Sequence, residues 1–176
     1  VTQNPLITTV ALPRTSLQGR VDTYSGTLRL TVSPMDTLRV HGVLSHQERD
    51  NRTPVATLSL VSTDMFPGGT VSSTPYSYVQ DKGTLTADFR GPGSLRLAGG
   101  VEYLMTNRTW QEASDTQEAT AWLRVRVRPL ESLHLTARVA HAERTHDGYG
   151  VATWISPAEN PLLRQFTLAD RQRNTA

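Results

Sequence analysis

Hydrophobic and polar residues alternate strictly along much of the chain. The clearest alternation occupies residues 27–32, 38–42, 84–90, 95–99, 123–128 and 133–139. A repeat of two residues places successive side chains on opposite faces of a β-strand, whereas an α-helix repeats every ~3.6 residues. Each stretch is therefore predicted to be a strand, with Leu, Val, Ala or Phe on one face and mainly Arg, Thr, His or acidic residues on the other.

The predicted strands form pairs that are joined by short turns. Each turn contains Pro or Gly, which suit a chain reversal better than the interior of a strand; the turns are residues 33–37, 91–94 and 129–132. The connections between pairs are longer and more polar, and they cover residues 49–83, residues 108–118 and the residues after 144. A weak strand is predicted within the first connection, near residues 56–60. Short turns at one end and long loops at the other are typical of bacterial outer-membrane barrels.

Strand length and charge favour a membrane barrel over a soluble sandwich. The last pair is predicted at residues 119–128 and 133–142. These lengths match the about 9–11 residues of a tilted membrane strand better than the about 5–6 of a typical soluble strand. Arg124, Arg126 and Arg128 share one strand face. Because unpaired charges cost several kcal/mol in a dry interior, that face is predicted to meet water and the apolar face lipid.

These patterns predict an all-β fold: an antiparallel up-and-down transmembrane β-barrel, present as a segment of a large porin-like barrel, with short periplasmic turns and long extracellular loops. Residues 1–176 are predicted to form one segment without separate domains. Phe89 and Tyr103 are expected at the two lipid–water interfaces. The polar face is predicted to line the lumen, where it would select anions or bind a partner; its candidate residues are Arg29, Arg39, His41, Arg96, Glu102, Arg124, Arg126, Arg128, His134 and Arg138.

Composition narrows the possible functions. The 176 residues include no Cys, which excludes disulfides, iron–sulfur clusters and covalent c-type haem attachment on this chain. No apolar run approaches the ~20 residues of a membrane-spanning helix. The formal net charge is only +2, without a basic cluster interleaved with aromatics, so nucleic acid is not indicated. The chain begins without Met or a secretion signal and ends in a polar tail, so we expect an internal portion of a longer protein.

The sequence does not indicate an enzyme, a cofactor site or a metal site. It contains no GxSxG elbow, phosphate-binding loop, dinucleotide fingerprint or HExxH motif. The segment from His141 to His146, with Glu143 between them, is the one weak metal candidate. Asp88 and Glu102 could face each other across a hairpin, but neighbouring arginines favour ion pairing over acid–base catalysis.

Two other functions are compatible with the alternation. The first is a general diffusion porin or a small OmpA-like barrel. The second is a soluble β-sandwich binding module, in which a second sheet would cover the apolar face.

Several short sequence segments follow one another in a recognisable order. The most specific is Asn160–Arg173; the others are Ser16–Thr23, Arg49–Pro54, Pro75–Tyr78, Leu97–Tyr103, Arg108–Glu112 and Trp122–Leu130. In these segments and their order the chain resembles the MtrB/PioB family, the outer-membrane barrels that accompany decahaem cytochromes in extracellular electron transfer. Members of this family are several times longer than this chain, which agrees with an internal portion.

The resemblance implies a structural function in the bacterial outer membrane. It implies a sheath that houses and insulates a multihaem c-type cytochrome, with periplasmic and extracellular multihaem cytochromes and membrane lipid as partners. Haem would be carried by the partner cytochrome, and this chain would bind no cofactor of its own.

Overall fold

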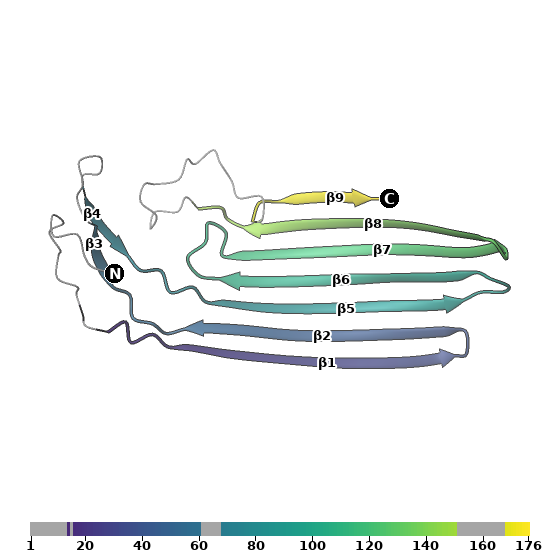
Figure 1. Ribbon diagram of the computed structural model, residues 1–176, viewed down its shortest axis with the longest axis horizontal. Coiled ribbons are helices and arrows are strands. Elements are labelled where there is room, and N and C mark those ends of the chain that lie inside the picture. The colour runs from purple at the N-terminus through teal and green to yellow at the C-terminus, as the bar shows by residue number, and fades with distance from the viewer. Residues whose placement is uncertain (1–13, 15, 61–67, 151–167) are drawn as a thin grey trace.

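The computed structural model describes residues 14, 16–60, 68–150 and 168–176. Its main feature is one antiparallel sheet in the order β1-β2-β5-β6-β7-β8-β9 (Figure 1). Its strands are β1 (Val21–Met35), β2 (Leu38–Asn51), β5 (Tyr78–Arg90), β6 (Arg96–Arg108), β7 (Asp115–Leu130), β8 (Leu133–Asp147) and β9 (Arg171–Thr175). A separate small hairpin joins β3 (Thr57–Leu60) to β4 (Gly69–Ser72). The weak strand predicted near residues 56–60 is therefore present.

The strands are longer than the alternation predicted. β7 has 16 residues and β8 has 15, against the predicted ranges 119–128 and 133–142. The additional pairs lie mainly at the ends of the strands next to the long loops, where Gln117 pairs with Thr145 and Glu118 with Arg144. Both faces are polar there, so the ladder continues after the alternation of hydrophobic and polar residues has ended.

The three predicted short turns lie together at one end of the sheet, which we call the turn end; the opposite end is the loop end (Figure 1). At the middle turn, the amide of Gly91 donates to the carbonyl of Leu95 at 3.0 Å, and Gly93 has a φ of 63°. A positive φ at this position is a conformation that glycine adopts without steric cost. The hairpins β1–β2 and β7–β8 instead close with a shift of register next to their turns.

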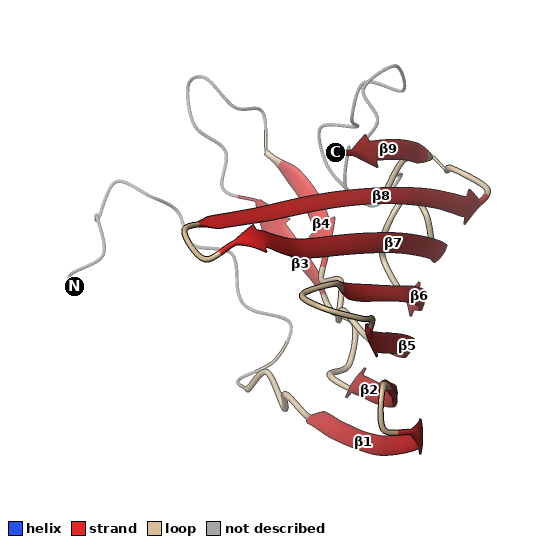
Figure 2. Ribbon diagram, turned by 90° about the vertical axis from the view of Figure 1, so that its right-hand side faces the viewer, coloured by secondary structure: helices blue, strands red, loops and turns tan. Residues whose placement is uncertain are grey.

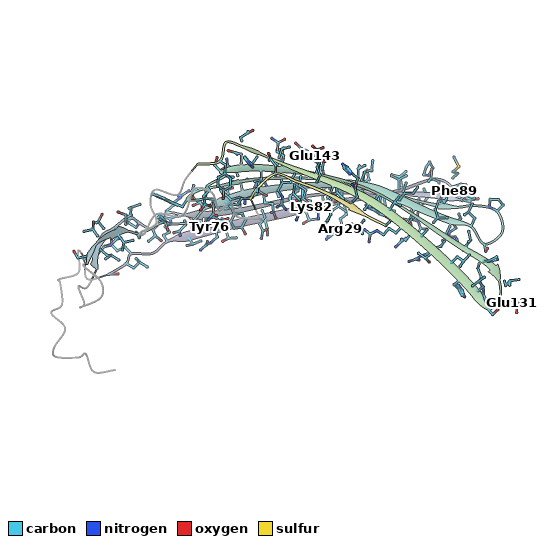
Figure 3. All side chains as sticks on the ribbon, turned by 90° about the horizontal axis from the view of Figure 1, so that it is seen from above. Arg29, Tyr76, Lys82, Phe89, Glu131 and Glu143 are labelled. Carbon is cyan, nitrogen blue, oxygen red and sulfur yellow. The ribbon has the colours of Figure 1, made fainter. Side chains whose placement is uncertain are left out.

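The sheet is a single curved layer without a conventional core (Figures 2 and 3). Among the described residues the buried hydrophobic side chains are few and small, namely Ala98, Ala113 and Ala142 with Leu168. Leu28 and Leu30 are 66% and 64% exposed, and no second sheet of described residues covers them. No helix in the described ranges is long and apolar enough to cross a membrane.

The register sorts the side chains into two faces, because directly opposite residues of an antiparallel pair point the same way. Arg29 and Lys82 lie on the concave side of the sheet, whereas Phe89 and Glu143 lie on the convex side (Figure 3). Following the pairs from these residues gives a concave face that is polar and a convex face that is apolar toward the turn end. The two-faced wall that the alternation predicted is thus observed.

Candidate functional site

The concave face carries most of the charged side chains that the sequence singled out. The strand register places eight of the ten predicted lumen residues on this face; the other two lie beside the β7–β8 turn. The eight residues are Arg29, Arg39, His41, Arg96, Glu102, Arg124, Arg126 and Arg138. They come from β1, β2, β6, β7 and β8, so the curvature of the sheet turns them toward a common space.

Arginines concentrate in two adjacent cross-strand rows near the turn end. The first row runs from β2 to β8 and the second from β5 to β8. The first row contains Arg39, Asp88, Ala98, Arg124 and Arg138. The second row contains Arg90, Arg96, Arg126 and Thr136. We call the arginines of these rows the arginine rows. They border a hollow of about 350 Å³, which Arg39, Arg96 and Arg126 line together with Asp88.

The charges of the arginine rows are nearly uncompensated. Arg90 lies directly opposite Arg96, Arg96 opposite Arg126, and Arg124 opposite Arg138. Within the described residues, none of these arginines forms an ion pair. The one carboxylate of the rows, Asp88, lies 3.9 Å from Nε2 of His41.

Trp122 lies beside the arginine rows. It is on the concave face opposite Gly100, and the guanidinium groups of Arg124 and Arg138 stand 5.7 Å and 5.6 Å from its ring centroid. These distances are within the range of cation–π attraction. The indole therefore holds two arginines that their mutual repulsion would otherwise separate.

Toward the loop end, the same face carries several ion pairs. Nζ of Lys82 lies 2.9 Å from Glu102, and Glu118 accepts from both Arg144 and Arg171, at 2.5 Å and 3.2 Å. The Glu118 and Arg144 side chains are only 17% and 16% exposed. A second hollow of about 320 Å³ lies beside this network. The lysine and arginine ion pairs of the concave face that the described residues form thus lie toward the loop end, and the arginine rows near the turn end contain none.

Arg128 and His134 do not join this surface in the same way. They lie beyond Val127–Leu135, where the register of the β7–β8 hairpin shifts. The guanidinium of Arg128 donates to the carbonyl of Glu131 in its own turn, at 2.7 Å and 3.2 Å. The paired register does not include these two residues, so their place on the lumen face stays a prediction.

The convex face forms an apolar area between the two predicted interface aromatics. Phe89 lies near the turn end, beside Leu97 and Val125, with the pair Val127–Leu135 one row beyond it. Tyr103 lies toward the loop end. The Tyr103 hydroxyl donates to Oε1 of Gln117 at 2.7 Å, so its polar tip points to the polar part of the convex face. The position of Phe89 and Tyr103 at the two lipid–water interfaces stays a prediction.

The two weaker candidates do not assemble. His141 and Glu143 lie on the convex face, opposite Asn174 and Gln172, whereas His146 lies on the concave face opposite Thr116. In the part of the chain that the structure describes, no group of three or more His, Asp or Glu could hold a metal ion.

Asp88 and Glu102 share the concave face but are not opposite each other. Asp88 pairs with Ala98, and Glu102 pairs with Thr84. The ion pair of Glu102 is with Lys82 instead.

Sequence reasoning missed Lys82 and Trp122 on the concave face. Their signal was available in the parity, since Lys82 is two residues from Thr84 and Trp122 is two residues from Arg124. The most specific sequence word, Asn160–Arg173, lies mostly outside the described residues.

A curved antiparallel meander with an apolar convex face and a charged concave face is the wall of a transmembrane β-barrel. The family described as "Putative outer membrane beta-barrel porin, MtrB/PioB" matches residues 1–176. The chain belongs to this family. It is therefore part of a bacterial outer-membrane porin and not of an enzyme, and the soluble sandwich is excluded.

A named relative supports the same assignment. The chain is 28% identical over 162 residues to Outer membrane protein MtrB of Shewanella baltica (strain OS185). The match covers 92% of this chain and 23% of that protein, so the chain spans about a quarter of the length of its relative.

Proposed function

We propose that this chain forms part of a barrel wall that houses a multihaem c-type cytochrome and insulates it from the membrane. The observation that carries the proposal is the uncompensated positive charge of the concave face. Arg96 and Arg126, directly opposite each other, form no ion pair within the described residues. A lumen filled only with water does not require such an arrangement, whereas a partner with acidic groups would neutralise it.

In this function each face of the wall has a separate task. The convex Leu and Val side chains contact lipid and hold the wall in the outer membrane. The concave face surrounds the cytochrome and excludes lipid from it. Electrons would pass through the haems of the partner, because this chain has no Cys to attach a c-type haem. The wall would act by keeping the haems aligned across a barrier that blocks charge.

The extracellular and periplasmic partners follow from the same proposal. A periplasmic multihaem cytochrome would enter the barrel from the turn end, because short turns face the periplasm in outer-membrane barrels. It would meet an extracellular multihaem cytochrome at the loop end. The family assignment and the similarity to a protein named MtrB support this arrangement.

The experiment is to purify the full-length protein from native outer membranes in mild detergent and record its absorbance. We expect a haem Soret band that co-migrates with the barrel protein, and a second polypeptide that stains for covalent haem. The control is the same protein refolded alone from inclusion bodies, which should be colourless. A native preparation without haem would contradict the proposal.

A general diffusion porin is the second candidate. The paired ions around Glu118 favour it, since a neutralised wet wall also suits an open aqueous channel. Planar-bilayer conductance discriminates between the two functions. A haem-free native protein with large, steady ion conductance would support the diffusion porin.

A further inference from the structure

The arginine rows place like charges directly against each other. Arg96 faces Arg90 on one side and Arg126 on the other, and Arg124 faces Arg138. Like charges that are directly opposite across neighbouring strands destabilise a sheet. The repulsion between these arginines therefore destabilises the folded wall.

Opposed arginines toward the loop end differ from those of the arginine rows. There Lys82 pairs with Glu102, and Arg144 of β8 and Arg171 of β9, which lie opposite each other, share Glu118. Among the arginine rows, Asp88 is the only carboxylate, and its ion-pair contact is with His41. Among the described residues, the concave face thus holds its lysine and arginine ion pairs toward the loop end, whereas the arginine rows hold none.

The open charges are accessible to a large partner. Arg39, Arg96, Arg126 and Arg138 are exposed, and several of them border the hollow of about 350 Å³. Arg124 is half-buried because it stands against Trp122. Tryptophan and arginine are both enriched among the residues that supply most of the binding free energy of protein interfaces.

We propose that the arginine rows are a docking surface for a carboxylate-rich surface, formed by Asp and Glu side chains, on the protein held in the lumen. This inference rests on the proposed function, which supplies the occupant. Guanidinium groups bind carboxylates through two parallel hydrogen bonds, and each such pair would relieve one of the arginine–arginine oppositions. Charge complementarity thus identifies the occupant as an acidic protein surface.

The location of the surface gives it a further role. Because the arginine rows lie near the turn end, they fix how far the occupant enters and which part of it faces the periplasmic mouth. The loop-end half of the face holds ion pairs of its own, between Lys82 and Glu102 and around Glu118, and its described residues present no comparable row of opposed arginines. The docking surface therefore sets the depth and orientation of the partner.

The test is the double variant Arg96→Gln/Arg126→Gln in the full-length protein, expressed in its native host. The matched control is Arg29→Gln/Arg173→Gln. Arg29 and Arg173 are exposed and lie on the same concave face, in a row outside the arginine rows. The measurements are haem retained per barrel after washing at increasing salt, and the urea midpoint of the barrel in lipid vesicles.

The two measurements should move in opposite directions for the test variant. Removing the repulsion should leave the urea midpoint unchanged or raise it, while the apparent affinity for the cytochrome falls at least about tenfold. A residue that only supported the fold would lower both. The control should retain its haem at every salt concentration that the unaltered protein tolerates.

Unchanged haem retention in the test variant would overturn the docking surface, as would an equal loss in the control. An unaltered protein that carries no haem protein would overturn the proposed function and the docking surface together. If the unaltered protein carries a cytochrome that the test variant holds equally well, only the docking surface fails. Should the glutamine variant assemble poorly, Arg96→Lys/Arg126→Lys keeps the charge and should retain haem better than glutamine.

Discussion

Trp122 of β7 lies against Gly100, its direct register partner on β6. A Cβ atom at Gly100 would come within 3.0 Å of Nε1 of Trp122 and within 2.9 Å of the carbonyl oxygen of Leu85. Gly100 therefore provides the space in which the indole sits, and the indole holds Arg124 and Arg138 at one edge of the arginine rows.

The first prediction concerns this contact. Gly100→Ala should destabilise the barrel by about 1–3 kcal/mol, because the new methyl group meets backbone that cannot easily move. Urea unfolding of the full-length protein in lipid vesicles measures the change. Gly42→Ala is the control, since a Cβ there meets nothing within 4 Å. Equal stability of the two variants would show that Trp122 does not depend on Gly100.

The second prediction tests the assignment of the two faces. Leu85 lies on the convex face, 52% exposed, and the preceding Thr84 lies on the concave face. Leu85→Arg should destabilise the folded barrel by ~2–4 kcal/mol, because it places a charge among lipid chains. Thr84→Arg should cost far less, since its neighbour across the strands is Glu102. Similar losses from these adjacent positions would mean that the faces are misassigned.

The third prediction concerns the ion network at the loop end. Glu118→Gln leaves Arg144 and Arg171 without their shared carboxylate and should destabilise the barrel by about 1–3 kcal/mol. The comparison is Glu102→Gln, whose pair with Lys82 is 36–42% exposed and should contribute at most about 1 kcal/mol. Both values come from urea midpoints at low salt. A larger loss at Glu102 than at Glu118 would contradict the ranking by burial.

The fourth prediction separates Arg128 from the arginines of the same strand. Because its guanidinium donates to the carbonyl of Glu131, Arg128→Gln should leave haem retention unchanged. Arg126→Gln should lower it. The salt at which half of the haem is lost compares the two variants directly. A loss at Arg128 that matched the loss at Arg126 would extend the docking surface to the turn.

The fold was largely predictable, because lipid outside and water inside impose different chemistry on alternate residues. Residues 27–32 and 123–128 show this period clearly, and they lie within β1 and β7. The ends of the strands were not predictable in the same way. Gln117 and Glu118 are both polar, since that part of the ladder has water on both faces, and the period disappears there although the backbone pairing continues.

The candidate site was predictable as a set of residues but not as an electrostatic pattern. Parity placed Arg39 and Arg124 on one face, as the register confirms. Parity could not show which charges are paired, because the contact between Arg171 and Glu118 joins residues 53 positions apart. Parity also could not show that Arg128 contacts the carbonyl of Glu131 in its own turn, next to a shift of register.

The sheet has two lateral borders, formed by β1 on one side and by β8 with the short β9 on the other. Of the 15 residues of β8, only Ala140–Arg144 pair with β9, so the amide and carbonyl groups of its remaining outer border have no strand beside them in the described part of the chain. Such borders recruit any strand that is available. Produced alone in water, this arc would therefore associate with further copies of itself and precipitate, whereas neighbouring strands of the same wall would complete the hydrogen bonding at both borders.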